Sequence, residues 1–518
     1  MKQFKKQFRK TFPSLIRAAL PLILAASCSD DPDLKPVPPD DREYGEEWYA
    51  GGKNGTIFNA TARAYKQPVQ PVNDDPVLYR QFMRGEELAG KSFVTAGETG
   101  YSGLGPVYIR KSCVACHPSY GGHSKRVDKF DTSDSRNGYL LMIYDPASPT
   151  LALASKYFTG MTQTRAVTPF KPPIEESGIH LTWNEYVDEH GNRYADGTPY
   201  SDGYSYAGTL IYPTVEVEQS AILFPDFDMS RHAASIEATI GIYGVGLLDA
   251  ISDEDLRAQY DEEQARGYSP GVIGADIDET GLNPYFPGKH PGRFTYLCTR
   301  ATLDNGPGAN ALWNITNVTR PDRRYHYITG EYARVMSEDA DVQAALKKTA
   351  EEIYADLMST GLEPEMTMED FDAFMVWHRG IAVPAARNLD DETVQRGRTL
   401  FHETGCTACH RPSWTTRANY TPLPALSNQK IYPYTDLLRH DLDMKEPGRA
   451  RLCRTTPLWG RGLLPVTSGH SDMLHDLRAR NYEEAILWHG GEAQIVRDKF
   501  RAMPKADRQA LIRFLEAI

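Results

Sequence analysis

The stretch Cys406-Thr407-Ala408-Cys409-His410 decides the organisation of this chain, because a Cys-x-x-Cys-His run is the minimal apparatus for attaching a haem covalently to a polypeptide. The two cysteines form thioether bonds to the macrocycle, and the histidine binds its iron. A second copy, Cys113-Val114-Ala115-Cys116-His117, lies far upstream. One copy alone is also compatible with a redox dithiol or half of a zinc site. Two copies, each completed by a histidine, predict two covalently attached c-type haems.

The N-terminus predicts export from the cytoplasm. A basic start precedes an apolar run that is too short to span a bilayer stably, so we interpret residues 1–27 as a signal peptide. Its end, Leu24-Ala25-Ala26-Ser27-Cys28, resembles a bacterial lipobox, in which Cys28 becomes the lipidated first residue. An ordinary signal peptide with an incidental cysteine is the alternative. We therefore expect an outer-membrane lipoprotein that faces the periplasm or the cell surface.

Length and charge set the broad class. With 518 residues the chain is long enough for two or three domains. The formal net charge of −12 argues against a nucleic-acid partner and favours neutral or cationic ones. We expect a disordered tether rich in Pro, Asp and Gly over residues 28–75, an N-terminal haem domain over 76–384 and a C-terminal haem domain over 385–518.

Helical patterns precede both haem motifs. Residues 77–93 have a helix-like apolar rhythm, and so do residues 390–403, where Gly397 and Phe401 share one face. A small residue and an aromatic so placed allow close crossing with the last helix of the chain. That last helix is predicted by a stripe at helical spacing: Leu511, Phe514, Leu515 and Ile518.

The fold class expected from these patterns is mainly α, with two cytochrome c-like haem domains. Strand-like pieces around residues 139–144 and 207–217 indicate that the N-terminal domain is enlarged by irregular and β-containing insertions.

Three further features leave alternatives open. Cys298 and Cys453 either form a disulfide or remain two separate buried thiols. Asp276-Ile277-Asp278-Glu279 is a candidate calcium loop, with a solvated loop as the alternative. Tryptophans that relay electrons between the haems, or simply pack, are Trp313, Trp459 and Trp488.

A set of motifs in a fixed order points to a family. The C-terminal third contains Tyr434-Thr435-Asp436-Leu437-Leu438-Arg439-His440-Asp441, Arg454-Thr455-Thr456-Pro457-Leu458-Trp459-Gly460, Leu474-His475-Asp476-Leu477-Arg478-Ala479-Arg480 and Glu483-Glu484-Ala485-Ile486-Leu487-Trp488-His489-Gly490-Gly491-Glu492-Ala493. Upstream stand Gly103-Leu104-Gly105-Pro106, Gly246-Leu247-Leu248-Asp249-Ala250-Ile251 and Gly292-Arg293-Phe294.

This order of motifs resembles the bacterial di-haem c-type oxidoreductases described as peroxidases or thiol oxidoreductases. The likeness covers about residues 76–518 and is patchy before Asp390. More distantly, the order resembles the bacterial di-haem cytochrome c peroxidases and the related enzyme that matures a tryptophan-derived quinone. One segment departs from the family, because Thr295-Tyr296-Leu297-Cys298 stands where a Gly-Trp-Lys type sequence is usual. The distal side of the first haem is therefore expected to differ from the family pattern.

The motifs make His117 and His410 the proximal iron ligands, and function depends on the opposite face of each iron. An open face can take peroxide, whereas a strongly filled face only moves electrons. For the C-terminal haem the resemblance implies His489, which stands where the peroxidases have an axial methionine. The alternative ligands are His440, Met444, Met473 and His475.

No distal ligand stands out for the N-terminal haem. His123, just beyond the motif, is expected beside the ring or at the surface. Asp249 or His326 is the candidate acid–base group for moving a proton between peroxide oxygens. Arg323 or Arg324 is the candidate for stabilising the charge on the leaving oxygen, and ordinary salt bridges or core contacts are the alternative roles.

The resemblance implies a peroxidase-like oxidoreductase. Its C-terminal haem would accept electrons from a small donor protein or a quinol-linked donor, and its N-terminal haem would reduce peroxide or oxidise another substrate. The alternatives are a non-enzymatic di-haem electron-transfer lipoprotein with both irons six-coordinate, and an oxidative modifier of a partner protein.

Overall fold

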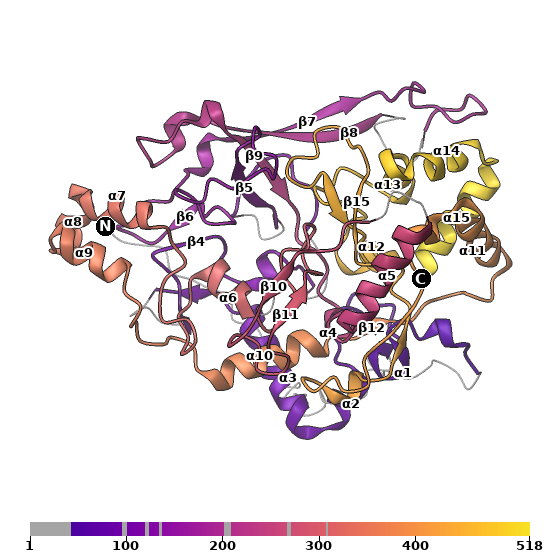
Figure 1. Cartoon of the computed structure of the whole chain (residues 1–518), viewed down its shortest axis with the longest axis horizontal. Helices are drawn as coiled ribbons and strands as arrows, with labels where there is room; N and C mark the ends of the chain where they lie inside the picture. Colours follow the sequence, from indigo (N-terminus) through magenta and orange to yellow (C-terminus); the bar gives the residue numbers. More distant parts are fainter. Residues whose placement is uncertain are drawn as a thin grey trace, which may run out of the picture.

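The computed structural model describes residues 43–95, 101–119, 124–133, 137–200, 209–266, 271–306 and 309–518. Helices and short strands alternate along this part of the chain, and the strands pair two by two (Figure 1). The structure is 35% helical and 15% strand. The expectation of a mainly α protein built from two cytochrome c-like domains is therefore wrong. With 35 Pro and 41 Gly, many segments between the helices cannot continue them, and their backbone groups pair in short ladders instead.

A pair of crossing helices lies beside the N-terminal haem motif. Helix α3 (Pro76–Gly90) begins at Asp75, whose carboxylate accepts hydrogen bonds from two backbone N–H groups of the first turn. It packs against α10 (Met368–Gly380), which lies next to it in Figure 1. A Cβ atom at Gly85 would lie 2.3 Å from the carbonyl oxygen of Ala373. Only glycine allows the two helices to approach so closely.

A second pair of crossing helices lies beside the C-terminal haem motif. Helices α11 (Glu392–Thr404) and α15 (Lys505–Ala517) cross where a Cβ atom at Gly397 would lie 1.9 Å from a backbone oxygen of α15. The rings of Phe401 and Phe514 meet at a centroid distance of 5.4 Å. The predicted crossing of these helices is confirmed.

The longest strands belong to the insertions of the N-terminal part. Strands β7 (Ile179–Tyr186) and β8 (Leu210–Val217) form an antiparallel hairpin that runs across the top of Figure 1 toward the C-terminal helices. There Tyr186 stacks on Trp488, with ring centroids 5.1 Å apart and planes at 20°. The strands expected near residues 139–144 and 207–217 are therefore present, and the hairpin joins the two halves of the chain.

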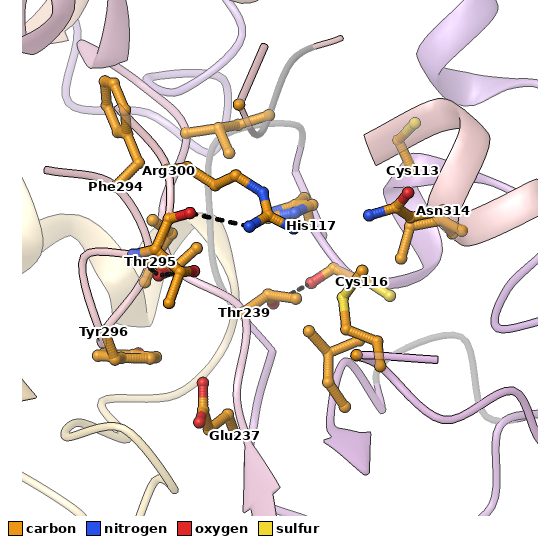
Figure 2. A pocket seen from close by; sticks show the side chains of 18 of the residues that line it. Cys113, Cys116, His117, Glu237, Thr239, Phe294, Thr295, Tyr296, Arg300 and Asn314 are labelled. Atoms are coloured by element: carbon orange, nitrogen blue, oxygen red, sulfur yellow. Dashed lines mark hydrogen bonds between the residues drawn. The ribbon is translucent and has the colours of Figure 1, made fainter. Parts of the chain in front are cut away.

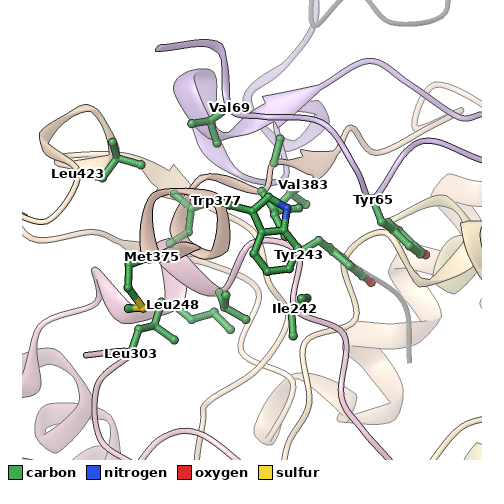
Figure 3. Packing of buried hydrophobic residues seen from close by; sticks show 14 of the residues in the cluster. Tyr65, Val69, Ile242, Tyr243, Leu248, Leu303, Met375, Trp377, Val383 and Leu423 are labelled. Carbon is green, nitrogen blue, oxygen red and sulfur yellow. The ribbon is translucent and has the colours of Figure 1, made fainter. Parts of the chain in front are cut away.

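Residues 43–75, expected as part of the disordered tether over 28–75, instead pack into the core. Tyr65 stacks on Tyr243 at 4.2 Å, and its hydroxyl donates to the carbonyl oxygen of Gly460 at 2.7 Å. Figure 3 shows Tyr65 and Tyr243 in the same cluster of buried side chains. Prolines and glycines suggested a linker, but the apolar side chains between them are fully buried: Ile57, Ala64, Tyr65, Val69 and Val72.

The expected signal peptide and Cys28 lie outside the described residues, and so does His123. The described part has no helix with the length and apolar character needed to cross a membrane. The remaining helices are α1 (Gly52–Gly55), α2 (Gln70–Asp74), α4 (Val245–Asp249), α5 (Asp253–Arg266), α6 (Ala309–Thr316), α7 (Gly330–Glu338), α8 (Ala340–Leu346), α9 (Ala350–Leu357), α12 (Leu464–Thr467), α13 (Tyr482–Leu487) and α14 (Gln494–Ala502).

The other strand pairs are short and tie segments that are distant in sequence. They are β1 (Thr56–Ile57) with β12 (Val383–Pro384), β2 (Phe93–Val94) with β3 (Tyr101–Ser102), β4 (Val107–Tyr108) with β6 (Arg165–Ala166), β5 (Leu140–Tyr144) with β9 (Ala233–Glu237), β10 (Asp276–Asp278) with β11 (Lys289–Pro291), β13 (Trp414–Thr415) with β14 (Lys430–Ile431) and β15 (Arg439–Asp441) with β16 (Leu452–Arg454).

Candidate functional site: two haem cavities

Both Cys-x-x-Cys-His motifs adopt the same backbone turn. Single 3-10 turns span Cys113–Ala115 and Cys406–Ala408. In each motif the backbone N–H of the histidine donates to the carbonyl oxygen of the first cysteine at 2.9 Å. The turn brings both thiols and the imidazole of each motif to the wall of one cavity.

The environment of the cysteines disfavours the redox alternative. Burial raises the pKa of the Cys113 and Cys406 thiols to about 12. A redox dithiol needs a readily ionised thiolate, and such sites lower the thiol pKa. A neutral thioether has no such requirement, so the buried position of these sulfurs suits covalent attachment of a haem.

The C-terminal cavity has a volume of about 190 Å³, and two histidines lie close together in its wall. The ring centroids of His410 and His489 lie 6.3 Å apart. Two imidazoles that bind one metal ion from opposite sides, each through a bond of about 2 Å, have centroids about 6 Å apart. The spacing of His410 and His489 therefore fits a haem iron between them.

The hydrogen bonds of the two rings also suit iron binding. Nδ1 of His410 lies 3.1 Å from the carbonyl oxygen of Tyr434, and Nδ1 of His489 lies 2.6 Å from that of Ala485. Because a carbonyl only accepts, each Nδ1 carries the proton and each Nε2 keeps its lone pair. Burial lowers the pKa of both imidazoles, that of His410 to about 4, so both are neutral.

The four alternative ligands line the same cavity without this arrangement. His440 lies between two carboxylates, with Nε2 2.8 Å from Asp436 and Nδ1 2.8 Å from Glu492. These partners raise the pKa of His440 against the effect of burial, so its ring is an imidazolium with no lone pair. Nε2 of His475 is engaged by a backbone oxygen at 3.1 Å. The remaining candidates are side chains of the apolar wall: Met444 and Met473.

One group of side chains in the described part of the chain has the spacing of a metal site: Cys409, Asp436 and His440. Two facts argue against a metal there. Both ring nitrogens of His440 are engaged by carboxylates, and Cys409 belongs to the Cys-x-x-Cys-His motif. The group is better explained as a buried ion pair of His440 with Asp436, next to the thiol of Cys409.

The N-terminal cavity is larger, about 310 Å³, and its walls come from distant segments. Figure 2 shows Cys113 and Cys116 on one side, with Phe294, Thr295 and Tyr296 across from them. A hydrogen bond fixes the backbone of the motif, because the Thr239 hydroxyl donates to the carbonyl oxygen of Cys116 at 2.6 Å.

Glu237, at the end of β9, is the acidic side chain in this cavity wall (Figure 2). Burial raises its pKa to about 7, and Arg449 partly opposes that shift. One of its carboxylate oxygens is buried without a hydrogen bond from the described residues. Near neutral pH this carboxyl group can therefore either accept or donate a proton.

His378 of α10 also lines the N-terminal cavity. Burial lowers its pKa to about 3, and the nearby His117 contributes to that shift. Its Nδ1 has no hydrogen-bond partner among the described residues. The N-terminal cavity thus holds a second neutral imidazole, on the helix that crosses α3.

Asp249, a predicted acid–base group, does not line either cavity. Its carboxylate accepts hydrogen bonds from the Tyr420 hydroxyl at 2.6 Å and from the backbone N–H of Leu303 at 3.1 Å. Asp249 is 4% exposed, and burial raises its pKa. In this structure it ties α4 to two loops.

The other predicted catalytic side chains also lie outside the cavity wall. Arg323 contacts Asp322 and the ring of Trp313. Arg324 donates to the carbonyl oxygen of Leu362 at the surface. Burial lowers the pKa of His326 to about 4, and its neighbour Tyr327, not His326, lines the cavity.

The carboxylates of the acidic segment at β10 do not converge on a shared site. Asp276 pairs with Arg257 at the surface. Glu279 is fully buried and accepts a hydrogen bond from the backbone N–H of Thr302 at 3.1 Å. The carboxylates of the candidate calcium loop therefore have separate partners.

Cys298 and Cys453 are separate thiols in the structure. Cys298 is buried with its sulfur 3.7 Å from the carbonyl oxygen of Leu437, and Cys453 donates to that of Ala450 at 2.7 Å. The alternative of two separate thiols fits this arrangement.

Two residues of these cavities were not singled out in the sequence: Glu237 and His378. Glu237 carried a usable signal, since it is one of two acidic residues in the apolar stretch over 234–251, the other being Asp249. Tyr296 lies in the segment that departs from the family pattern, and it lines both cavities. His378 had no signal, because the sequence does not tell which side of α10 faces a haem.

Comparison with known proteins agrees with the resemblance found in the sequence. Residues 341–518 match a family model described as "Di-haem oxidoreductase, putative peroxidase". No curated protein and no solved structure matches the chain. The resemblance to di-haem oxidoreductases is therefore confirmed over residues 341–518, a stretch that contains His410 and His489.

Proposed function

Because residues 341–518 match a family of di-haem oxidoreductases, we propose that this protein is a peroxidase-like enzyme with two covalently bound c-type haems. The C-terminal cavity is the electron-entry site. The N-terminal cavity binds peroxide or another small oxidisable substrate. The donor is a small electron-donor protein or a quinol-linked protein.

This proposal rests on the difference between the two cavities. In the C-terminal cavity His489 lies opposite His410 at 6.3 Å, which supports a six-coordinate iron that only exchanges electrons. The N-terminal cavity is larger, and its wall includes the carboxyl group of Glu237. Burial raises the pKa of this group to about 7. A space beside a proton-transfer group is what peroxide reduction requires.

The proposed chemistry assigns the proton transfers to Glu237. Reduction of peroxide to two waters takes two electrons, which the donor would supply through the bound haems, and two protons from solvent. Glu237 would take the proton from one peroxide oxygen and deliver it to the other as the O–O bond breaks. Arg300, which also lines the cavity, would stabilise negative charge on the leaving oxygen. Tyr296 lines both cavities, so its ring lies between the two proposed sites.

His378 supports a second candidate function. If its imidazole occupies the face opposite His117, both irons are six-coordinate and the protein only transfers electrons. Its neutral ring and its place in the cavity wall suit such a ligand. The proposal of a peroxidase-like enzyme therefore depends on His378 not filling that face.

Absorption and electron paramagnetic resonance spectra of the purified protein test the choice. We expect one low-spin and one high-spin haem, with carbon monoxide and peroxide perturbing only the high-spin haem. His489→Ala should convert the low-spin haem to high spin, whereas His378→Ala, the matched control, should leave it unchanged. Two low-spin haems that ignore both ligands, with a new high-spin signal in His378→Ala, would establish the electron-transfer function instead.

We also propose that Cys28 carries a lipid that anchors the protein to the outer membrane, on the periplasmic or extracellular side. Mass spectrometry of the mature N-terminus tests the anchor.

If a high-spin haem reacts with peroxide but oxidises no small donor, oxidative modification of a partner protein becomes the better function.

A further inference from the structure

One buried arginine in the wall of the C-terminal cavity has no counter-charge in the described part of the chain. Arg454, at the end of β16, is 3% exposed. Its Nη1 donates to the carbonyl oxygen of Arg293 at 2.8 Å, and its Nε is buried without a partner. Among the described residues, no carboxylate oxygen lies within 4.0 Å of its guanidinium group.

This arrangement is unfavourable for the protein alone. An unpaired buried charge costs several kcal/mol, and arginine cannot escape the cost by losing its proton. The acidic groups that could compensate are already engaged, because Asp436 and Glu492 both bind His440. The missing partner of Arg454 is therefore an anion that the chain does not supply.

The position of Arg454 identifies the class of anion. It lines the C-terminal cavity with Arg461, and the same two side chains line a narrow gap toward the N-terminal cavity. The rest of the cavity is largely apolar: Phe401, Leu442, Met444, Leu458, Leu511 and Leu515. A haem has the complementary character, since its apolar macrocycle carries two propionate carboxylates on one edge.

We propose that Arg454 binds a propionate of the haem in the C-terminal cavity, with Arg461 beside it on the same wall. Arginine pairs with carboxylates through charge-assisted hydrogen bonds that fix orientation as well as charge. Arg454 also links the two halves of the molecule, because its backbone N–H donates to the carbonyl oxygen of Tyr296 at 2.7 Å. The assignment rests on a haem in this cavity, as proposed above, and not on peroxidase activity.

A positive charge next to a haem favours the ferrous state, because reduction lowers the charge on the iron. Arg454→Gln should therefore lower the midpoint potential of the low-spin haem in a spectroelectrochemical titration. Arg454→Lys keeps the charge but loses the paired hydrogen bonds, so its shift should be smaller and in the same direction. Arg449→Gln, the matched control in the wall of the other cavity, should leave the low-spin haem unchanged.

An unchanged low-spin potential in Arg454→Gln, or a shift confined to the high-spin haem, would overturn the assignment. Two haems per chain in the pyridine haemochrome assay show that the variant is folded and loaded. A protein that shows the potential shift but does not react with peroxide keeps this proposal and loses the peroxidase function.

If Arg454→Gln does not fold, the wild-type protein supplies the test. A carboxylate beside an arginine stays ionised, so the low-spin potential should show no propionate step between about pH 5 and pH 8. Glu237→Gln removes the carboxyl group of the other cavity, whose pKa of about 7 lies in this range. A step that persists in Glu237→Gln contradicts the proposed pairing.

Discussion

The two cavities are alike on the side formed by the haem motif, called here the near side, and differ on the opposite wall, called the far side. Each motif follows a helix that crosses a later helix at a glycine, Gly85 or Gly397, and each forms the same 3-10 turn. In the second cavity the ring of His489 lies 6.3 Å from that of His410, and its Nδ1 is engaged by a backbone carbonyl. The first cavity is larger, and its wall includes Glu237 and His378.

The comparison shows that the same Cys-x-x-Cys-His turn faces two different cavity walls, so the motif alone does not decide the chemistry of its cavity. The near side is local, because a few adjacent residues make the turn and its hydrogen bonds. The far side comes from segments that are distant in sequence. A duplicated motif can therefore serve two purposes in one chain.

The largest expected effect is the loss of one haem. Replacing Cys406 and Cys409 with Ala should leave one covalent haem per chain and abolish the low-spin signal, whereas replacing Cys113 and Cys116 should abolish the high-spin signal. Mass spectrometry of the denatured protein counts the attached haems. Two haems in either double variant would refute the assignment of one haem to each motif.

Glu237→Gln should slow the reaction with peroxide by roughly 10²–10⁴-fold, because the amide cannot accept a proton. In the wild type the carboxylate must be ionised to accept that proton, and its pKa is about 7. The rate should therefore fall as the pH drops below about 7, and this step should disappear in the variant. Stopped-flow measurements from acidic to alkaline pH provide the profile.

Asp249→Asn is the matched comparison for this prediction, because Asp249 is a buried carboxyl group outside the cavity. It should lower stability and keep the pH profile. If it removes the pH step instead, the acid–base role predicted from sequence for Asp249 is the correct one.

Gly397→Ala and Gly85→Ala should each destabilise the protein by about 1–3 kcal/mol, because the added Cβ meets a backbone oxygen of the crossing helix. The closer contact, 1.9 Å at Gly397 against 2.3 Å at Gly85, predicts the larger effect at Gly397. Gly361→Ala is the control, since its Cβ would meet open space. Denaturant unfolding followed by circular dichroism measures the differences, and equal effects in all three variants would contradict the close crossings.

The smallest expected effect concerns the hairpin over the C-terminal half. Tyr186→Ala removes the stack on Trp488, the residue before His489. It should lower the free energy of unfolding by about 0.5–1.5 kcal/mol beyond the effect of the buried surface area that is lost. Tyr354→Ala, an exposed tyrosine on α9, is the control. Unfolding free energies that fall equally in both variants would show that the stack does not hold the two halves together.

Much of the near side of each site followed from the sequence. The crossing of α11 and α15 was predictable from Gly397 and the stripe at Leu511, because helical spacing alone puts such residues on one face. The burial of residues 43–75 was not predictable, since their prolines and glycines resemble a linker and their partners, such as Tyr243, lie far away in sequence.

The sequence by itself determined the two Cys-x-x-Cys-His motifs, the histidines predicted to bind iron, the helices beside them and the resemblance that singled out His489. Each of these depends on residues close together in the chain or on motifs in a fixed order. Tertiary structure alone decided that Glu237, Tyr296 and Arg454 line the haem cavities and that Asp249 does not. The physical reason is that a cavity wall is made by side chains from distant segments, and local spacing carries no information about which of them meet.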